Sequence, residues 1–449
     1  MLDKNLAYKI LKEAIDYSPA NETEVILQGG KDALTRFANN HIHQNVMQKD
    51  YSLMVRAVFG KRTGIASCNI FEGSKLRELV DTACEIARHS EEDHEWIEVP
   101  SPATYQEFPQ GYFDATIDFS PQDREKSVET IVKLCKEKNL IAAGTFSNGD
   151  SMLSIMNSKG LFAYHKFTGA HFTLTAISDT GSGCSEYHSK RVEKITDKIE
   201  DLTKIAIDKA ILNKNPISLP PGEYTVILEE CAVKEYIMFL SYLGFGGLTF
   251  NEGRSFMSDK IGEKLMGDNI TISDDAGNIE VLGLPFDFEG NPRKKVVFIE
   301  NGIAKGIAHD RKTSIKAKCE STGHGLPPSA SCGPIPINLI LNTGNSSVED
   351  MVKSTKKGIL VTRFWYDNVV DEKKAIITGM TRDGTFLIEN GQIVNAVRNM
   401  RYNEALPDLF KRVVAIGKDR KSFSGEFMKI AVPAIKVDNF HFTGVSADV

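Results

Sequence analysis

Pro216-Ile217-Ser218-Leu219-Pro220-Pro221-Gly222 divides a chain of 449 residues into two parts of different character. Proline lacks a backbone N–H and has a fixed φ, so prolines this dense beside a glycine continue neither a helix nor a central strand. A chain of this length has room for two or three domains. We therefore place a domain boundary here and predict an α+β protein with an N-terminal α+β domain, 1–216, and a strand-rich C-terminal domain, 217–449.

The hydrophobic pattern before the boundary predicts two α+β units in succession. The first unit has predicted helices over 4–17 and 73–90, and strands over 24–27, 33–37 and 52–59. A connector rich in proline and acidic residues follows, with a sub-boundary near 100–118. Ser120, a good N-cap, and Pro121 then begin a helix that runs to about residue 138. The remaining predicted elements are strands at 140–147, 151–157, 161–166 and 169–179 and a charged helix over 190–213.

Strands and turns dominate the pattern after the boundary. Residues 223–228 are predicted to form a strand and 230–243 a helix, and a last helix is expected near 404–417. Asn-Gly pairs stand between β-prone runs at 301–302 and at 390–391. This dipeptide is the strongest short hairpin signal, so both sites are predicted to be tight hairpins.

The composition excludes several classes of protein. A net charge of −6 without any Lys/Arg block argues against a nucleic-acid surface. The apolar runs are far too short to span a bilayer, and the N-terminus lacks the apolar segment of a signal peptide. The cysteines number seven, an odd count without a CxxC pair, so we expect free thiols and a cytoplasmic location. No P-loop, GxGxxG, GxSxG or HExxH motif occurs.

One stretch, 318–338, gathers glycines, prolines, hydroxyl residues, two thiols and an imidazole. It is predicted to be an extended surface loop that ends in a strand, and long ordered loops often carry function. Glycines on both sides of His324 allow a close backbone approach. Cys319 and Cys332 flank this histidine and could form a thiolate–imidazole pair. The alternatives are a well-ordered connection with a satisfied histidine and buried structural cysteines.

Other candidate sites have simpler structural explanations. His41 and His43 would share one face of a strand and could bind a metal, although a solvated hairpin is the stronger interpretation. Carboxylates are paired at 274–275 and at 287–289. They could serve acid–base chemistry or cation binding, but Asp and Gly also favour turns, which is the interpretation we prefer.

Four segments together resemble the TldD/PmbA family, whose members are labelled modulators of DNA gyrase and understood as peptidases. The segments are Gly253-Arg254-Ser255-Phe256-Met257-Ser258-Asp259-Lys260-Ile261-Gly262, Pro285-Phe286-Asp287-Phe288-Glu289-Gly290, Ser321-Thr322-Gly323-His324-Gly325 and Gly333-Pro334-Ile335-Pro336-Ile337-Asn338. Each is short, but their order and spacing together carry the resemblance over nearly the whole chain. Nothing in the charge or motifs supports contact with DNA or gyrase.

The resemblance also indicates which kind of subunit this is. TldD-type subunits carry HExxxH on a helix after the first strand of the C-terminal domain, and a later cysteine completes their zinc site. No HExxxH occurs here, and the register from the predicted strand puts Met238, Phe239 and Leu243 at the motif's positions. Residues 361–366 contain no cysteine. The chain therefore looks like the PmbA/TldE type, without catalytic or metal-binding residues of its own and with zinc expected in a TldD-type partner.

This resemblance implies an oligomeric zinc metallopeptidase that cleaves unfolded peptides, with a TldD-type partner or a second copy of the chain. The residues expected to line the peptide channel or the subunit interface are Ser321, Thr322, Gly323, His324, Gly325 and Asn338. Valine at either glycine is predicted to abolish cleavage without disturbing the fold. The alternatives are a stand-alone peptide-binding or regulatory protein, a cysteine hydrolase that uses Cys319 or Cys332 with His324, and a metal site of Glu230, Cys231 and Glu235.

Overall fold

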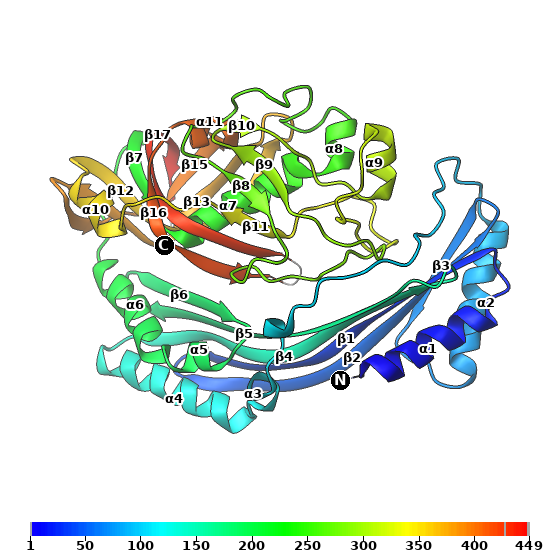
Figure 1. Ribbon diagram of the computed structural model, residues 1–449. Helices are drawn as coiled ribbons and strands as arrows, with labels where there is room; N and C mark the ends of the chain where they lie inside the picture. The colour runs from blue at the N-terminus through cyan, green and yellow to red at the C-terminus, as the bar shows by residue number, and fades with distance from the viewer. Residues whose placement is uncertain (1, 426–427, 447–449) are drawn as a thin grey trace.

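The computed structural model describes residues 2–425 and 428–446, and its mixed α+β architecture confirms the predicted fold class. The N-terminal part is built on a six-stranded antiparallel sheet with the order β3-β2-β1-β4-β5-β6. Its strands are β1 (Glu22–Ala38), β2 (His41–Phe59), β3 (Arg62–Cys68), β4 (Ile141–Asn157), β5 (Phe162–Ile177) and β6 (Ser182–Ser189). The sheet is long and strongly curved (Figure 1).

Helices cover the convex face of this N-terminal sheet (Figure 1). They are α1 (Lys4–Tyr17), α2 (Ser74–His89), α3 (Asp114–Asp118), α4 (Pro121–Glu137), α5 (Glu193–Thr196) and α6 (Ile199–Leu212). The predicted start of α4 is confirmed: the Ser120 hydroxyl accepts from the Asp123 N–H, and the Asp123 carboxylate accepts from the Ser120 N–H in return. The predicted helix over 190–213 is wrong in one respect, because residues 197–198 interrupt it.

The strands of this sheet are longer than the sequence predicts. Residues 24–27 and 33–37 belong to one strand, β1, which runs through Gly29 and Gly30. A Cβ at Gly30 would lie 1.9 Å from the Asp150 carbonyl oxygen, so glycine here permits close strand approach rather than a turn. Asn39 and Asn40 form the turn between β1 and β2, and both have the positive φ of a two-residue hairpin.

The C-terminal part contains an eleven-stranded sheet in which β17, β15, β13, β12 and β7 close into a ring. Its strands are β7 (Gly222–Leu228), β8 (Ile272–Asp274), β9 (Val296–Glu300), β10 (Ile303–Ala304), β11 (Asn338–Leu341), β12 (Lys357–Asp371), β13 (Ile376–Glu389), β14 (Gln392–Ala396), β15 (Met400–Ala405), β16 (Val413–Ser424) and β17 (Lys429–Val445). Both Asn-Gly hairpins are confirmed as β9–β10 and β13–β14.

Helix α7 (Glu230–Leu240) and a π-helical turn, η2 (Ser241–Phe245), follow β7, as predicted. The other C-terminal helices are short: α8 (Gly247–Asn251), α9 (Arg311–Ala317), α10 (Val348–Lys353) and α11 (Leu406–Lys411). The predicted helix at 404–417 is therefore wrong beyond residue 411, because residues 413–417 pair with β17 as part of β16. That cross-strand pairing overrides a local helical pattern.

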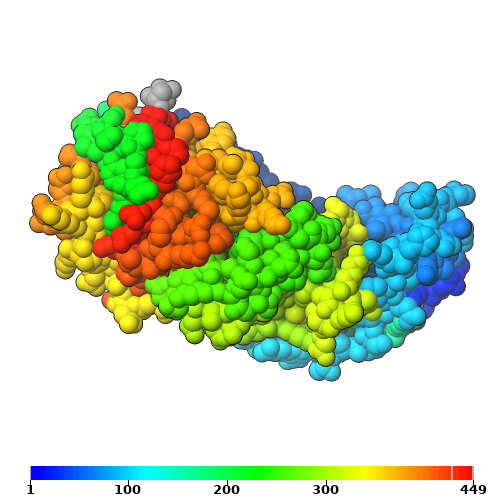
Figure 2. Space-filling view, turned by 90° about the horizontal axis from the view of Figure 1, so that it is seen from above, coloured from blue at the N-terminus to red at the C-terminus, as the bar shows by residue number. Residues whose placement is uncertain are grey.

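The C-terminal part lies over the concave face of the N-terminal sheet, and the N-terminal sheet extends beyond it at one end (Figures 1 and 2). Phe286 and Phe288 of the C-terminal part pack against Ile26, Leu153 and Ile155 of the sheet in a shared apolar cluster. None of the helices within residues 2–425 and 428–446 has the length and hydrophobicity that a membrane crossing requires.

Candidate functional site: the groove between the two sheets

Helix α7 and the η2 turn that follows it carry the positions at which the resemblance places a zinc motif. Met238 and Phe239 are half-buried and pack against the main C-terminal core, and Leu243 is buried in it. The η2 turn begins directly after α7, and π-helical turns of this kind occur often at functional sites. Thioether, phenyl and isobutyl side chains do not supply the thiolate, imidazole or carboxylate ligands that zinc takes. These residues therefore do not fit a zinc ion.

The other candidate metal ligands do not form a metal site among the described residues either. Burial raises the pKa of Glu230, Cys231 and Glu235, which favours the protonated forms that do not bind metal. His41 and His43 are exposed at the hairpin end of β2. Within residues 2–425 and 428–446, no three His, Cys, Asp or Glu side chains group as a metal ion would need.

His324 lies in a buried ionic network rather than at the surface. Its Nδ1 is 2.8 Å from the Thr322 hydroxyl, and its Nε2 is 3.2 Å from Asp274 Oδ1. Arg293 donates to the same carboxylate oxygen at 3.0 Å, while the other oxygen accepts the backbone N–H groups of Ile337 (2.8 Å) and Asn338 (2.6 Å). We call Asp274, Arg293 and His324 the aspartate cluster.

The electrostatics of the aspartate cluster are balanced. Burial by itself would raise the pKa of Asp274, but Arg293 and His324 outweigh it and hold that pKa well below its usual range. Burial and the Arg293 charge lower the pKa of His324, while Asp274 acts in the opposite direction. Asp274 and His324 thus join the loop to β11 rather than perform acid–base chemistry.

The predicted site residues separate into two groups. Ser321, Thr322 and Gly323 pack on His309 and Pro292, and Gly325 donates its N–H to Asp287 at 2.8 Å. The hydroxyl of Ser321 and the imidazole of His324 therefore contact this chain and not the groove. Asn338 is different, because it lines the cavity between the two sheets.

The structure explains why glycine stands on both sides of His324. Gly323 has φ +69°, and a Cβ there would lie 2.3 Å from the Pro292 carbonyl oxygen. A Cβ at Gly325 would lie 2.6 Å from the Glu289 side chain. The expectation that valine leaves the fold intact is therefore wrong at Gly323, where the clash is with backbone at a positive φ, whereas at Gly325 the contact is with the Glu289 side chain.

The two thiols near His324 are not placed for catalysis. Cys319 and Cys332 are exposed, whereas His324 is buried and makes its contacts to Thr322 and Asp274. Burial raises the pKa of the Cys319 thiol, which opposes thiolate formation. The predicted alternative of buried structural cysteines is also wrong for this pair. The structure gives the cysteine-hydrolase alternative no support.

A groove runs between the concave face of the N-terminal sheet and the C-terminal part. It contains two adjoining cavities of about 620 Å³ and 440 Å³ that share Gly29, Asp50, Phe167 and His188. The smaller cavity is closed on the C-terminal side by Ile337, Asn338, Lys429 and their neighbours. This cavity lies at the interface between the two parts of the chain, and ligand sites occur preferentially at such interfaces.

Ion pairs hold the two walls of the groove together. Glu186 of β6 accepts from Lys234 of α7 at 2.8 Å and lies 3.2 Å from His171 Nε2. Lys209 of α6 pairs with Glu229, just before α7. Burial opposes the charge on Glu186, but His171 and Lys234 outweigh it and hold its pKa well below the usual range. These contacts fix α7 against β6.

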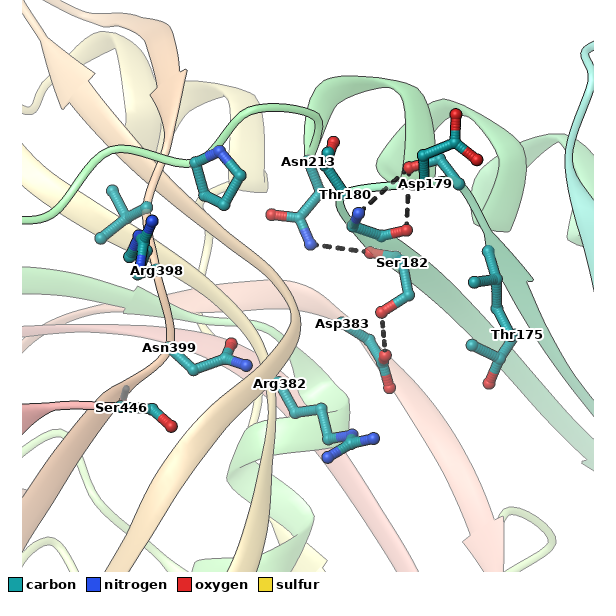
Figure 3. Close-up of a pocket in the computed structure, with 15 residues that line it drawn as sticks. Thr175, Asp179, Thr180, Ser182, Asn213, Arg382, Asp383, Arg398, Asn399 and Ser446 are labelled. Carbon is teal, nitrogen blue, oxygen red and sulfur yellow. Dashed lines mark hydrogen bonds between the residues drawn. The ribbon is translucent and has the colours of Figure 1, made fainter. Parts of the chain in front are cut away.

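A third cavity, of about 310 Å³, lies beside these ion pairs at the far end of β6 (Figure 3). The Ser182 hydroxyl donates to Asp383 at 2.5 Å, and the Asn213 amide donates to the Ser182 carbonyl at 2.9 Å (Figure 3). Arg363 Nε also donates to Asp383, at 2.6 Å. Ser182 and Arg363 thus both bond to Asp383, which joins β6 to β12 and β13 beside this cavity.

The sequence reasoning missed the polar face of β6. Glu186, His188 and Lys190 alternate with Tyr187 and Ser189, so their side chains share one face of the strand. This period of two was available in the sequence as a signal of a polar sheet face. The predicted elements end a strand at 179 and begin a helix at 190, and β6 lies between them.

Comparisons with known proteins agree with this fold. Residues 221–444 match the model of the PmbA/TldA metallopeptidase C-terminal domain, and residues 23–87 match PmbA/TldA metallopeptidase domain 1. A metalloprotease of Methanocaldococcus jannaschii is 24% identical over 376 residues, which are 81% of this chain and 82% of that protein. A metalloprotease TldD homolog of Buchnera aphidicola is 29% identical over 231 residues, 51% of this chain and 47% of that protein.

A solved structure extends the likeness to the whole fold. The crystal structure of TldE from Thermococcus kodakarensis superposes with a TM-score of 0.86 at 21% identity, over 97% of this chain and 99% of that one. At this level of identity the agreement concerns the fold, including the placement of one sheet above the other.

Proposed function

Because this chain belongs to the TldD/PmbA metallopeptidase family, we propose that it is the subunit without metal of a two-chain zinc metallopeptidase that acts on unfolded peptides. A TldD-type partner with HExxxH would supply the metal and the catalytic glutamate. This chain would supply one wall of the peptide path, the groove between its two sheets.

One observation carries the proposal. The side chains at the motif positions of α7 and η2 are apolar and pack in or against the core, and a groove with cavities of about 620 Å³ and 440 Å³ lies between the two sheets. Such a groove can bind a peptide, whereas the apolar side chains at these three positions cannot hold a metal-bound water. The likeness to a structure described as TldE and to a protein named a TldD homolog supports a partnership between two related subunits.

The test is zinc content and peptide cleavage, measured on the purified chain alone and after co-expression with a HExxxH-bearing relative from the same organism. We expect zinc and cleavage of an unstructured peptide only in the co-purified complex. Glutamine in place of the partner's HExxxH glutamate should abolish cleavage, whereas Glu235→Gln in this chain should not.

Two results would contradict this proposal. Stoichiometric zinc in the isolated chain would mean that other ligands exist, and Glu230, Cys231 and Glu235 would then be mutated first. Peptide binding by the isolated chain that no HExxxH-bearing relative converts to cleavage would favour the stand-alone peptide-binding protein instead.

A further inference from the structure

Two lysines from opposite walls meet in the smaller cavity of the groove. Lys190 directly follows β6, and Lys429 is the first residue of β17. Both ammonium groups lie over the ring of Phe167, at 4.5 Å and 5.1 Å from its centroid, so both enter the same cavity from opposite sides. The aromatic face favours cations at this position. We call Lys190 and Lys429 the lysine pair.

The charge of the lysine pair is not neutralised by the described parts of the chain. Neither amine has a carboxylate of residues 2–425 or 428–446 within 4.0 Å, whereas Lys209 and Lys234 nearby are both paired. Lys429 makes one further contact, donating to the Leu282 carbonyl at 2.5 Å. Burial lowers the pKa of Lys190 to about 8, and burial with the neighbouring Lys190 charge lowers the pKa of Lys429 as well.

Two polar atoms beside the lysine pair also lack partners. Asn338 is 1% exposed, and its amide nitrogen donates to the Val281 carbonyl at 2.7 Å, but its Oδ1 is buried without a hydrogen bond. The Nδ1 atom of His188 is likewise buried and unpartnered among the described residues. Both residues line the cavity that holds Lys190 and Lys429. Buried polar atoms normally find partners, so these unpaired atoms indicate a place for a ligand.

We propose that the lysine pair binds a carboxylate of the peptide, with Asn338 Oδ1 accepting a backbone N–H of the same peptide. This inference rests on the proposed role in peptide binding. A carboxylate has an oxygen for each ammonium and would relieve the repulsion between them through charge-assisted hydrogen bonds. The adjoining larger cavity would hold the rest of the chain. The carboxylate comes either from the C-terminus or from an aspartate or glutamate side chain.

Binding should weaken as the pH rises above about 8, because the free lysine pair then loses protons that the bound carboxylate needs. The other titratable groups that face the pair are His165 on β5, His188 on β6, Asp50 on β2 and Arg293. Burial lowers the pKa of both histidines, and Arg293 is paired with Asp274. Lys190 is thus the group facing the cavity that loses its proton in this range.

The test is fluorescence anisotropy with an unstructured peptide labelled at its N-terminus. Three forms are compared: free C-terminal carboxylate, C-terminal amide, and free carboxylate with each Asp and Glu replaced by Asn and Gln. The protein is the full chain and its Lys190→Met and Lys429→Met variants. Lys133→Met, an exposed lysine on α4 beneath the other face of the sheet, is the control for charge.

We expect the wild-type protein and Lys133→Met to bind about tenfold tighter to one carboxylate form than to its neutral counterpart. Lys190→Met and Lys429→Met should bind both forms equally. A difference on amidation assigns the C-terminus, and a difference on side-chain neutralisation assigns acidic residues. Equal binding of all three peptides by the wild-type protein overturns the lysine site but leaves the proposed function standing.

A second measurement decides the matter if no peptide binds. The lysine side chains are labelled with ¹³C at Cε, and N-acetylglycine is titrated against the full chain by NMR. Shifts confined to two resonances that disappear in Lys190→Met and Lys429→Met support the site. If no such shift occurs, the carboxylate site is overturned. If N-acetylglycine shifts these two resonances but no peptide binds, the carboxylate site stands and only the proposed role in peptide binding is contradicted.

Discussion

The aspartate cluster and the lysine pair both bury charge, but only one of them is neutralised by its neighbours among the described residues. In the aspartate cluster, each oxygen of Asp274 accepts from a cation or from backbone N–H groups. In the lysine pair, two lysine amines share one cavity without a carboxylate partner among the described residues, and Asn338 Oδ1 and His188 Nδ1, which belong to residues lining the same cavity, lack hydrogen bonds. The contrast teaches that the histidine most conspicuous in the sequence, His324, is structural, while the capacity to bind a ligand lies where charges are unmatched.

The largest effect should come from breaking the balanced cluster. Asp274→Asn removes the negative charge, leaves Arg293 buried without a counter-ion, and replaces an oxygen acceptor by an amide donor. We expect the free energy of unfolding to fall by about 3–5 kcal/mol. Urea denaturation of the isolated chain, followed by circular dichroism, measures this loss.

The neighbouring residue offers a matched control. The Asp275 side chain is 26% exposed, and its carboxylate lies 3.7 Å from the Lys295 amine. Asp275→Asn should therefore cost less than about 1 kcal/mol. Similar losses for the two variants would mean that the aspartate cluster is not the electrostatic centre that the contacts indicate.

The loop of the aspartate cluster should tolerate a methyl group poorly at Gly323. Gly323→Ala would place its Cβ against the Pro292 carbonyl at a positive φ, and we expect a loss of about 2–4 kcal/mol. Gly253 has a similar φ of +71° with nothing within 4 Å, so Gly253→Ala isolates the backbone cost of about 1–2 kcal/mol. Thermal unfolding compares the two, and equal losses would remove the packing argument.

Local signals predicted much of the fold. Helices α1, α2 and α4 follow from hydrophobic spacing and caps, and the hairpins follow from Asn-Asn and Asn-Gly turns. Strand length did not follow, because Gly29 and Gly30 resemble a break although close strand packing retains them in β1. Likewise β16 is a strand only because residues from β17, far along the chain, pair with it.

The candidate site was less accessible to sequence reasoning. Asn338 was among the expected residues and lines the groove. Lys190 and Lys429 are more than two hundred positions apart, and only the stacking of one sheet on the other brings them together. The burial of His324 is equally nonlocal, since Asp274 and Arg293 come from other segments. The residue types indicate which side chains can carry charge or bind a ligand. Whether a buried charge is neutralised depends on contacts between segments that are far apart in the sequence.

A carboxyl group near the aspartate cluster should make stability depend on pH. Burial, together with Asp287 and Asp310, raises the pKa of Glu289 to about 8. A pKa raised on folding gives stability that is fully present below the ordinary value and is lost as the pH rises through about 8. Glu289→Gln mimics the protonated form and should exceed the wild type by about 2 kcal/mol above pH 8, with no difference near pH 4.

Unfolding by urea at several pH values tests this expectation. Glu300→Gln is the control, because its side chain is 54% exposed and its partner Lys305 lies 3.6 Å away. Its curve should follow the wild type throughout. If the Glu289→Gln curve also follows the wild type, Glu289 ionises in the folded protein without a loss of stability. Its surroundings would then stabilise a carboxylate charge as the aspartate cluster does.

The smallest change in the free energy of unfolding is expected at the lysine pair. Lys429→Met removes one of two facing cations and loses one hydrogen bond to Leu282, so the free energy of unfolding at pH 7 should equal or exceed that of the wild type by up to about 1 kcal/mol. Lys436, on the same strand, donates to the carbonyl and hydroxyl oxygens of Ser354, and Lys436→Met should lose about 1 kcal/mol. A loss at Lys429 as large as that of Asp274→Asn would instead mean that its charge is matched in solution, and the lysine pair would then belong with the structural clusters rather than with the ligand site.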